Sequence, residues 1–119
     1  MKIIILGRIP SKKNSTLVMC RGGRAIHIPS NAYRAWHKDA SRQLTEQSFS
    51  KLPIETSCVD ITLFAPDRRA GDLSNKAESI MDLLTDNGII KDDNWFVIPN
   101  LSLHFGGVEK DNPRVEINI

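Results

Sequence analysis

Carboxylates gather in two short segments of the second half of the chain. Asp72 closes a charged loop at residues 67–71, and Asp92 and Asp93 stand side by side, with Asp93 21 positions after Asp72. Cleavage of a phosphodiester at neutral pH needs an activated water and neutralisation of phosphate charge, and Mg²⁺ held by hard oxygen ligands supplies both. Asp72, Asp92 and Asp93 are therefore candidate ligands of a catalytic metal, and Asp67 is a further candidate.

The chain between these segments has a length that can bring the acids together. A predicted helix of about a dozen residues is ~18 Å long. If Gly88 reverses the chain, about five extended residues at ~3.3 Å each retrace ~17 Å. Asp92 and Asp93 then return to the start of the helix, where Asp72 lies. Three basic side chains beside the acids, Arg68, Arg69 and Lys76, are candidates for contacts with the phosphates.

Each acid also has a purely structural interpretation. A pair of acids in a loop is typical of a turn, and Asp72 is equally explained as an acid at a helix N-terminus, where the helix dipole favours negative charge. Asp82 and Asp86 lie farther along the predicted helix and are interpreted as surface acids.

Charge is distributed unevenly along the chain. Residues 1–42 carry nine Lys and Arg against one acid, or +8, and the remainder carries 7 − 13 = −6. A basic first third is typical of a segment that holds a polyanion, and an acidic second part suits cations. Solvated surface on both parts is the alternative. The candidate DNA-binding residues of the first third are Lys12, Lys13, Arg21 and Arg24.

The first half of the chain predicts a strand, a hairpin and a helix. Residues 2–8 are rich in isoleucine, and apolar runs at 16–20 and 25–28 flank a Gly-Gly turn with Arg21 and Arg24 at its tip. A helix is predicted to follow Ser30 as its N-cap. Its core-facing residues are Tyr33, Trp36, Ala40 and Leu44. A basic stripe of Arg34, Lys38 and Arg42 faces either a phosphate backbone or solvent.

The second half predicts a strand, a helix and two closing strands. Residues 58–65 alternate as a half-buried strand does. Asn75 and Glu78 have the spacing of a capping box, which places the helix start at Asn75. The predicted buried stripe of this helix is Ala77, Ile80, Met81 and Leu84, and Asn87-Gly88 ends it. Residues 101–105 and 115–119 are predicted strands, joined through Gly106-Gly107 and a polar turn at residues 111–113. This order predicts one α+β domain over residues 1–119, with a small mixed or antiparallel sheet and two main helices.

The bulk properties narrow the class of protein. The chain has 119 residues, of which 40% are hydrophobic, so its core is modest and a homodimer would extend it. No apolar run is long enough to span a bilayer. The apolar part of residues 1–8 is too short for a signal peptide, and Cys20 and Cys58 lack metal-type spacing. We therefore expect a cytoplasmic protein with no membrane partner.

Several segments together resemble the RusA family of phage and prophage endodeoxyribonucleases. Residues 66–76 (PDRRAGDLSNK) and 88–94 (GIIKDDN) match the family's basic loop, Asp-Leu-Asp-Asn motif, glycine and Asp-Asp pair, with the family's spacing between the first and last Asp. Residues 9–14 are similar to its N-terminal Pro-Ser-x-x-Asn segment, and residues 30–36 to its first helix. The resemblance covers most of the chain.

The resemblance implies a Holliday-junction resolvase that acts in recombination and repair, encoded by a bacterium or a phage. It implies a homodimer that binds four-way DNA junctions by shape and cuts two opposed strands with Mg²⁺, for which Mn²⁺ can substitute. Asp72 and Asp93 would be catalytic acids that bind the metal, and Asp92 an adjoining one. Arg68 and Arg69 would position the strand, and Lys12, Lys13, Arg21 and Arg24 would contact the DNA backbone farther out.

Two positions depart from the family pattern. The second Asp of Asp-Leu-Asp-Asn is Ser74 here, and the lysine expected six positions after the first Asp is Glu78. Lys76 is a candidate replacement for that lysine. Glu78 is either the missing carboxylate or the partner in the capping box. The departures also permit a module that binds branched DNA without cutting it.

Overall fold

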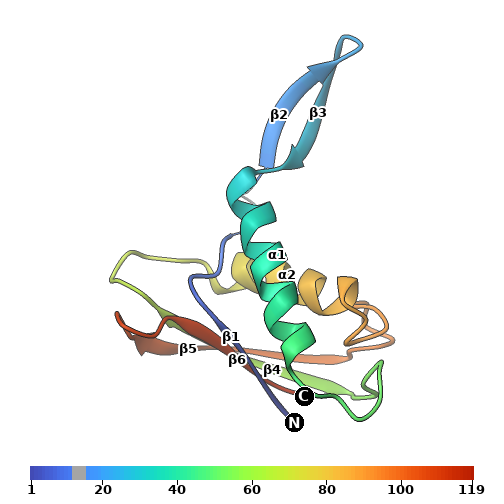
Figure 1. Ribbon diagram of the computed structural model, residues 1–119, viewed down its shortest axis with the longest axis vertical. Coiled ribbons are helices and arrows are strands. Elements are labelled where there is room, and N and C mark those ends of the chain that lie inside the picture. Colours follow the sequence, from blue (N-terminus) through green and yellow to red (C-terminus); the bar gives the residue numbers. More distant parts are fainter. Residues whose placement is uncertain (12–15) are drawn as a thin grey trace.

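Two helices pack against one face of a four-stranded sheet, and a separate two-stranded hairpin projects from this body (Figure 1). The computed structural model describes residues 1–11 and 16–119. In chain order, the elements are β1 (Lys2–Leu6), β2 (Thr16–Arg21), β3 (Arg24–Pro29), α1 (Asn31–Glu46), β4 (Cys58–Ala65), α2 (Leu73–Asp86), β5 (Asn100–Val108) and β6 (Arg114–Asn118). The predicted α+β domain with two main helices is confirmed.

The sheet is mixed, with the strand order β1-β6-β4-β5. β6 pairs antiparallel with both β1 and β4, whereas β4 and β5 run parallel. Parallel neighbours need a long crossover connection, and α2 with the segment 87–99 provides it. The charged loop at 66–72 therefore lies at the carboxyl end of β4, where it leads directly into α2.

The polar turn predicted between the two closing strands lies before β6 as expected, but the glycine part of this connection was wrong. Gly106 and Gly107, expected to join the two closing strands, both lie inside β5. Leu63 of β4 faces Phe105, but the next residue, Phe64, faces Gly107, so Gly106 is the extra residue of a β-bulge. A Cβ on Gly106 would lie 2.6 Å from Phe64 Cε1. This close approach of the ring to the strand explains why a glycine stands in the middle of β5.

The core lies between the inner face of the sheet and the two helices. Alternate strand residues point inward, and the fully buried ones include Ile3, Ile5, Val59, Ile61, Val115 and Ile117. The helices contribute Ala40 and Leu44 from α1 and Ile80, Leu83 and Leu84 from α2. The predicted inner faces of both helices are confirmed, although Trp36 is only partly buried against this cluster. No helix among the described residues is long and apolar enough to cross a membrane.

The start of α1 follows the sequence prediction. Ser30 is the N-cap, and its hydroxyl accepts a hydrogen bond from the Tyr33 N–H at 3.1 Å. The basic residues of the predicted stripe are exposed along this helix. Arg42 donates to both Asp39 and Glu46, at 2.8 and 2.6 Å. Because Arg42 is paired within the helix, part of the positive charge of the stripe is neutralised.

Two glutamines of α1 cover the free edge of the sheet at β1. The Gln43 amide accepts from the Leu6 N–H at 2.7 Å and donates to the Leu6 carbonyl at 3.1 Å. The Gln47 amide donates to the Ile4 carbonyl at 3.1 Å. An uncovered strand edge is a template for pairing with another chain. The two amides occupy hydrogen-bonding groups that a second β-strand would use.

We expect Gln43→Ala to lower the free energy of unfolding by about 1–2 kcal/mol, because its two hydrogen bonds to Leu6 are lost at roughly 1 kcal/mol each, together with an exposed bond to Asp39 within α1. Thermal melting of the variant checks this value. Thr45→Ala is the matched control, since the Thr45 hydroxyl bonds only within α1, to the Ser41 carbonyl. Equal melting temperatures for the two variants would show that the cover on β1 contributes nothing.

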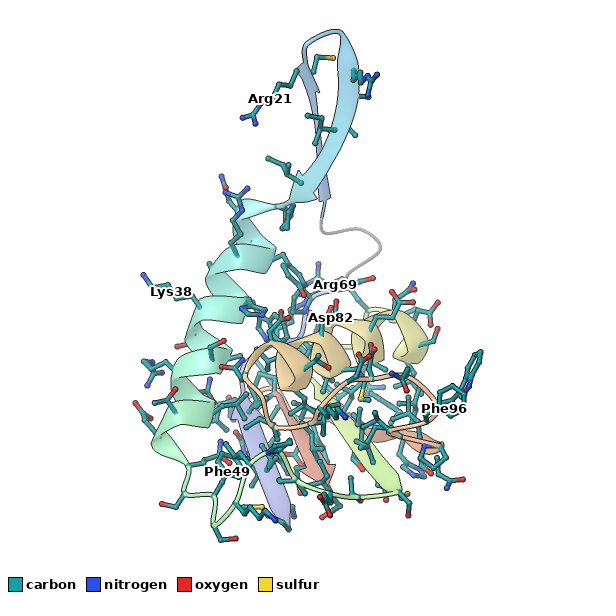
Figure 2. All side chains as sticks on the ribbon, turned by 90° about the vertical axis from the view of Figure 1, so that its right-hand side faces the viewer. Arg21, Lys38, Phe49, Arg69, Asp82 and Phe96 are labelled. Atoms are coloured by element: carbon teal, nitrogen blue, oxygen red, sulfur yellow. The ribbon has the colours of Figure 1, made fainter. Side chains whose placement is uncertain are left out.

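The predicted hairpin is confirmed, and it stands apart from the core. Arg21 and Arg24 form its last pair, and Gly22 and Gly23 between them have φ of +59° and +76°. Two positive φ values are what a two-residue hairpin turn with the twist of the strands requires. Figure 2 shows Arg21 near the free end of this projection. Lys12 and Lys13 lie outside the described residues.

Candidate active site

Asp72 begins α2 as its N-cap, which corrects the predicted start of this helix at Asn75. Asp72 Oδ1 accepts from the Ser74 N–H at 3.0 Å and from the Ser74 hydroxyl at 2.7 Å. Oδ2 accepts from the Asn75 side chain at 3.2 Å. The capping box of Asn75 and Glu78 is therefore wrong, because an aspartate three residues earlier already accepts from the free N–H groups of the first turn.

Ser74 has a definite role at this helix start. It stands where the family pattern has an acid, and both of its donors hold one oxygen of Asp72. A carboxylate in its place would offer no such hydroxyl and would repel Asp72. Ser74 therefore fixes the orientation of the Asp72 carboxylate. Glu78 is exposed on the second turn of α2.

Asp92 and Asp93 differ in their surroundings although they are adjacent. Asp92 accepts from the Asp93 N–H at 2.8 Å and from the Asn94 amide at 2.7 Å, and these bonds lower its pKa. Desolvation raises the pKa of Asp93, and the Asp92 carboxyl and the Asp82 charge raise it further. Asp93 is thus a carboxylate under repulsion from like charges, which a bound cation would relieve.

The interpretation of Asp82 as a surface acid needs correction. Asp82 is half-buried on α2 and acts on Asp93 electrostatically; Figure 2 shows where it lies on the helix. Asp86 is exposed, and its carboxylate lies 2.9 Å from His37 Nε2. Asp82 follows Asp72 by ten helical positions, which is ~15 Å along the axis. The acids around α2 are therefore distributed over both of its ends.

No three His, Cys, Asp or Glu side chains are grouped to hold a metal ion, among the residues that the structure describes. Asp72 is engaged with the first turn of α2, and Asp93 with Asp92 and Asp82. The assignment of Asp72, Asp92 and Asp93 to one metal site stays a prediction.

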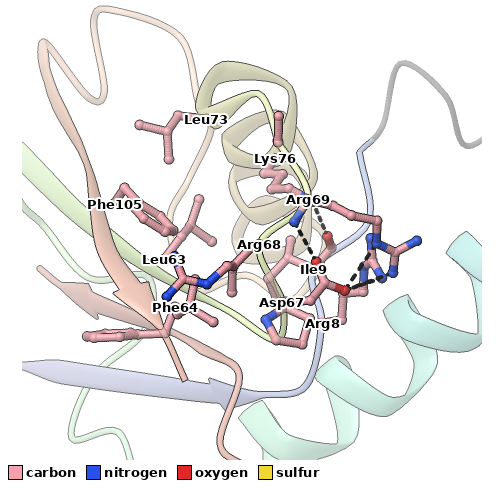
Figure 3. A pocket seen from close by; sticks show the side chains of 15 residues that line it. Arg8, Ile9, Leu63, Phe64, Asp67, Arg68, Arg69, Leu73, Lys76 and Phe105 are labelled. Atoms are coloured by element: carbon pink, nitrogen blue, oxygen red, sulfur yellow. Dashed lines mark hydrogen bonds and ion pairs between the residues drawn. The ribbon is translucent and has the colours of Figure 1, made fainter. Parts of the chain in front are cut away.

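A cavity of about 480 Å³ opens at the carboxyl end of β4, beneath the charged loop (Figure 3). Four basic residues line it: Arg8, Arg68, Arg69 and Lys76. Asp67 is the one acid among its lining residues. Gly71 and Leu73, the two neighbours of Asp72, also line it, so the N-cap of α2 lies beside its wall.

The basic residues of the cavity are arranged around Asp67. Arg69 donates to one Asp67 oxygen from Nε and Nη2, at 3.1 and 2.9 Å, and Arg8 lies 3.6 Å from the same oxygen. Hydrogen bonds from Arg69 lower the pKa of Asp67, and the charges of both arginines lower it further. Asp67 therefore stays ionised and holds two guanidinium groups at the rim, which leaves the cavity with a positive excess.

Lys76 reaches this cavity from the first turn of α2. Its Nζ donates to the Ile9 carbonyl at 2.8 Å. Burial lowers the pKa of Lys76, and the Arg8 charge lowers it further, partly offset by Asp67. A Cβ on Gly71 would lie 2.9 Å from Lys76 Cε, so the glycine leaves room for the lysine under the loop.

Sequence reasoning missed several residues of this cavity. Arg8 comes from the chain after β1, Phe64 from the end of β4, and Phe105 and Val108 from β5. These positions are up to 100 residues apart (108 − 8), and no local motif links them. The β4–β5 pairing and the bulge at Gly106 bring them together, and neither could be read from a single sequence.

Trp95 and Phe96 follow the acid pair and project from the surface. Their side chains are 76% and 89% exposed, and their rings lie 6.1 Å apart; Figure 2 shows Phe96 standing out from the body. Packing of these rings in the core is therefore excluded. An exposed aromatic pair of this kind suits a contact with a second subunit or stacking on DNA bases.

Comparison with known proteins gives the family. The family model for endodeoxyribonuclease RusA matches residues 9–119. The crossover junction endodeoxyribonuclease RusA of Aquifex aeolicus (strain VF5) is 31% identical over 91 residues, which cover 76% of this chain and 71% of that protein. This chain belongs to the RusA family of endodeoxyribonucleases. The resemblance drawn from residues 66–76 and 88–94 is thereby confirmed, and with it the prediction of a nuclease of the junction-resolving type.

Proposed function

We propose that this protein is a homodimeric, Mg²⁺-dependent endonuclease that cuts four-way DNA junctions, acting in the cytoplasm where its DNA substrate lies. The observation that carries the proposal is the cavity beside Asp72, with four basic residues against one acid. An anionic backbone suits this charge, and the family's crossover-junction activity supplies the branched shape. The domain spans residues 1–119.

The donor set fits Mg²⁺. Asp72, Asp92 and Asp93 offer carboxylate oxygens. Desolvation, and then the neighbouring Asp92 and Asp82, raise the pKa of Asp93, and a dication would favour its charged form. Mg²⁺ is usually held by one or two carboxylates together with substrate phosphates and waters, so a site completed by DNA needs no triad of protein acids. When bound, the cation supplies charge neutralisation and a more acidic water; Mn²⁺ can substitute.

The other residues position the strand. Asp72 is held in one orientation by Ser74 and Asn75, which preorganises it at the start of α2. Lys76 Nζ, held near the Ile9 carbonyl, would donate to an oxygen of the cleaved phosphate. Arg68 and Arg69 of the loop would bind the neighbouring phosphates, and a guanidinium suits this because its donors form a fork.

A synthetic four-way junction with labelled strands tests the proposal. We expect paired cuts in opposed strands in Mg²⁺ or Mn²⁺, none in EDTA, and no cuts in the matching linear duplex. Sedimentation of the protein should give the mass of two chains. A monomer, or equal cleavage of duplex and junction, would contradict the proposed assembly or specificity.

Junction binding without cleavage is the competing function. Ser74 in place of the family's acid favours it, since a hydroxyl brings no charge to a metal. Tight binding of the junction with no product in either metal would establish this alternative. In that case Asp72→Asn should leave the affinity for the junction unchanged.

The hairpin tip supplies a prediction on affinity. We expect Arg21→Ala/Arg24→Ala to weaken junction binding and to reduce the slope of log K against log salt by about 2, because each phosphate contact contributes roughly 0.9. Titrations between low and moderate salt measure this slope. Lys51→Ala/Lys110→Ala removes the same charge from exposed positions outside the hairpin. An equal loss in both double variants would mean that net charge, and not the hairpin, binds the DNA.

A further inference from the structure

The cavity under the charged loop is lined by two sets of residues. We call the four basic residues its rim and the apolar residues its floor. The largest residues of the floor are Ile9, Leu63, Phe64, Leu73, Phe105 and Val108. Phosphate contacts alone would need no such floor, since phosphates bind charged and polar donors. A cavity of about 480 Å³ lies in the range of about 300–1,000 Å³ that accommodates small organic ligands. The floor therefore points to a flat apolar group as part of the occupant.

The β-bulge shapes this floor. Leu63 and Phe64 are consecutive in β4, and consecutive strand residues normally point to opposite faces, yet both line the cavity. The register shift at Gly106 lies between them. The guanidinium of Arg114 lies over the Phe64 ring, 3.9 Å from its centroid, and helps to hold it in place. The floor is thus preformed by packing and hydrogen bonding of the sheet.

Phe105 is the aromatic residue that this floor leaves exposed. Its side chain is 58% exposed on the edge strand β5, and Figure 3 shows it at the cavity. Stacking of a base on an exposed aromatic ring is favourable and does not depend on the identity of the base, because every base has a π-face. Phe105 therefore offers a stacking surface in the same cavity that the basic residues line.

Charge and position select the occupant. Four basic residues line the cavity and Asp67 is the one acid among its lining residues, so the cavity has a positive excess that suits an anion. An apolar side chain of a partner subunit would leave those charges unneutralised. A nucleotide carries both a phosphate and a flat base, and Asp72 lies beside the cavity wall. Because Asp72 is a proposed catalytic acid, a nucleotide bound next to it belongs to the strand that is cut.

We propose that the cavity takes one unpaired base of the cleaved strand, stacked on Phe105, with its phosphates on the basic rim. Base pairs at the centre of an open four-way junction have lost a stacking neighbour on one side, so a base leaves its pair there at a lower cost than in an intact duplex. Taking up a base would thus let the enzyme distinguish junction from duplex at the point of cleavage. This inference rests on the proposed nuclease function.

Abasic nucleotides test the inference. Junctions carrying a single abasic site at each position around the cut are cleaved by the native protein and by Phe105→Ala. We expect one position at which the abasic site slows cleavage by the native protein ~10-fold or more. At that position the abasic site should slow Phe105→Ala less than twofold, compared with the same variant on the intact junction. Leu101→Ala is the matched control, since Leu101 is a similarly exposed apolar residue of β5 outside the cavity. It should keep the native sensitivity.

Two results overturn the inference while the nuclease function stands. The first is cleavage by the native protein with no position at which an abasic site matters. The second is equal sensitivity to the abasic site in the native protein and in Phe105→Ala.

A second measurement needs no cleavage. A junction with 2-aminopurine at the sensitive position, or at each central position if nothing is cut, is bound in EDTA. Uptake of the base predicts a fluorescence change with the native protein and Leu101→Ala that is lost with Phe105→Ala. If the cavity instead holds a partner subunit, Phe105→Ala weakens the dimer in sedimentation and the fluorescence is unchanged, which also overturns the inference.

Discussion

Asp93→Asn is expected to lower the rate of junction cleavage by at least ~100-fold, or about 2.7 kcal/mol of transition-state stabilisation. The substitution keeps the size of the side chain but removes the charge that would attract the cation. Single-turnover cleavage of a labelled junction with enzyme in excess measures the effect on the chemical step. Binding of the junction in EDTA should be retained, because the acid contributes repulsion to DNA and no attraction.

The stability of the same variant separates a catalytic loss from unfolding. The pKa of Asp93 is raised in the folded protein, so its ionisation at neutral pH costs folding free energy that the unfolded chain does not lose. Without divalent metal, Asp93→Asn should melt no lower than the native protein at pH 7. Any gain should vanish below about pH 3.8, the ordinary aspartate value. Added Mg²⁺ should stabilise the native protein more than the variant.

Asp111→Asn is the control for this experiment, since Asp111 is an exposed acid of the turn before β6. It should cleave at the native rate. Full activity of Asp93→Asn would remove Asp93 from the proposed site. If Asp93→Asn and Asp111→Asn are both fully active while Asp82→Asn loses cleavage activity, the cation instead lies at the C-terminal half of α2.

Much of the fold followed from local patterns. Ser30 was identified as a cap because a hydroxyl before an amphipathic run is a strong local signal, and Asn87-Gly88 ended α2 as predicted, with Gly88 at a φ of +68°. The capping box at Asn75 failed because a second acceptor, Asp72, lies one turn earlier and competes for the same N–H groups. Local spacing permits both, and only the path of the preceding loop decides.

The candidate site was predicted less completely than the fold. The acids were found from their spacing and from the family resemblance, because both depend on short segments. The lengths of the predicted helix and of the segment after it allowed Asp93 to return to Asp72. They gave no indication that the charge of Asp82 acts on Asp93. Arg8 and Phe105 could not be found at all, since a parallel β4–β5 pair and a bulge place them. Pairing of distant strands leaves no mark in a local window.

Ser74 connects the sequence departure to the geometry. In the family pattern this position carries an acid, and here its hydroxyl donates to Asp72 Oδ1 at 2.7 Å. A donor lowers the negative charge that Asp72 presents, while it fixes where that charge lies. If Asp72 binds the proposed cation, the hydroxyl of Ser74 gains orientation of Asp72 at the cost of attraction for the cation, and the contribution of the remaining acids and of Lys76 becomes larger.

Lys76→Met is the second substitution with a large expected effect. Methionine keeps the aliphatic packing beside Gly71 but removes the Nζ charge, and loss of one preorganised donor to a transferring phosphate costs about 10²–10³-fold in rate. Single-turnover cleavage should fall by that amount, while the affinity for the junction changes little beyond one phosphate contact. Lys110→Met, at an exposed turn, should leave both quantities unchanged.

The pH profile distinguishes a charged contact from a packing role for Lys76. Burial and Arg8 lower the pKa of Lys76 below the ordinary lysine value of 10.5, so Nζ loses its proton, and its charge, at a lower pH than an exposed lysine does. The native rate should therefore decline on the alkaline side before pH 10.5, and this decline should be absent in Lys76→Met. A variant that is slow at every pH but keeps the alkaline decline would show that another group titrates and that Lys76 only supports the loop.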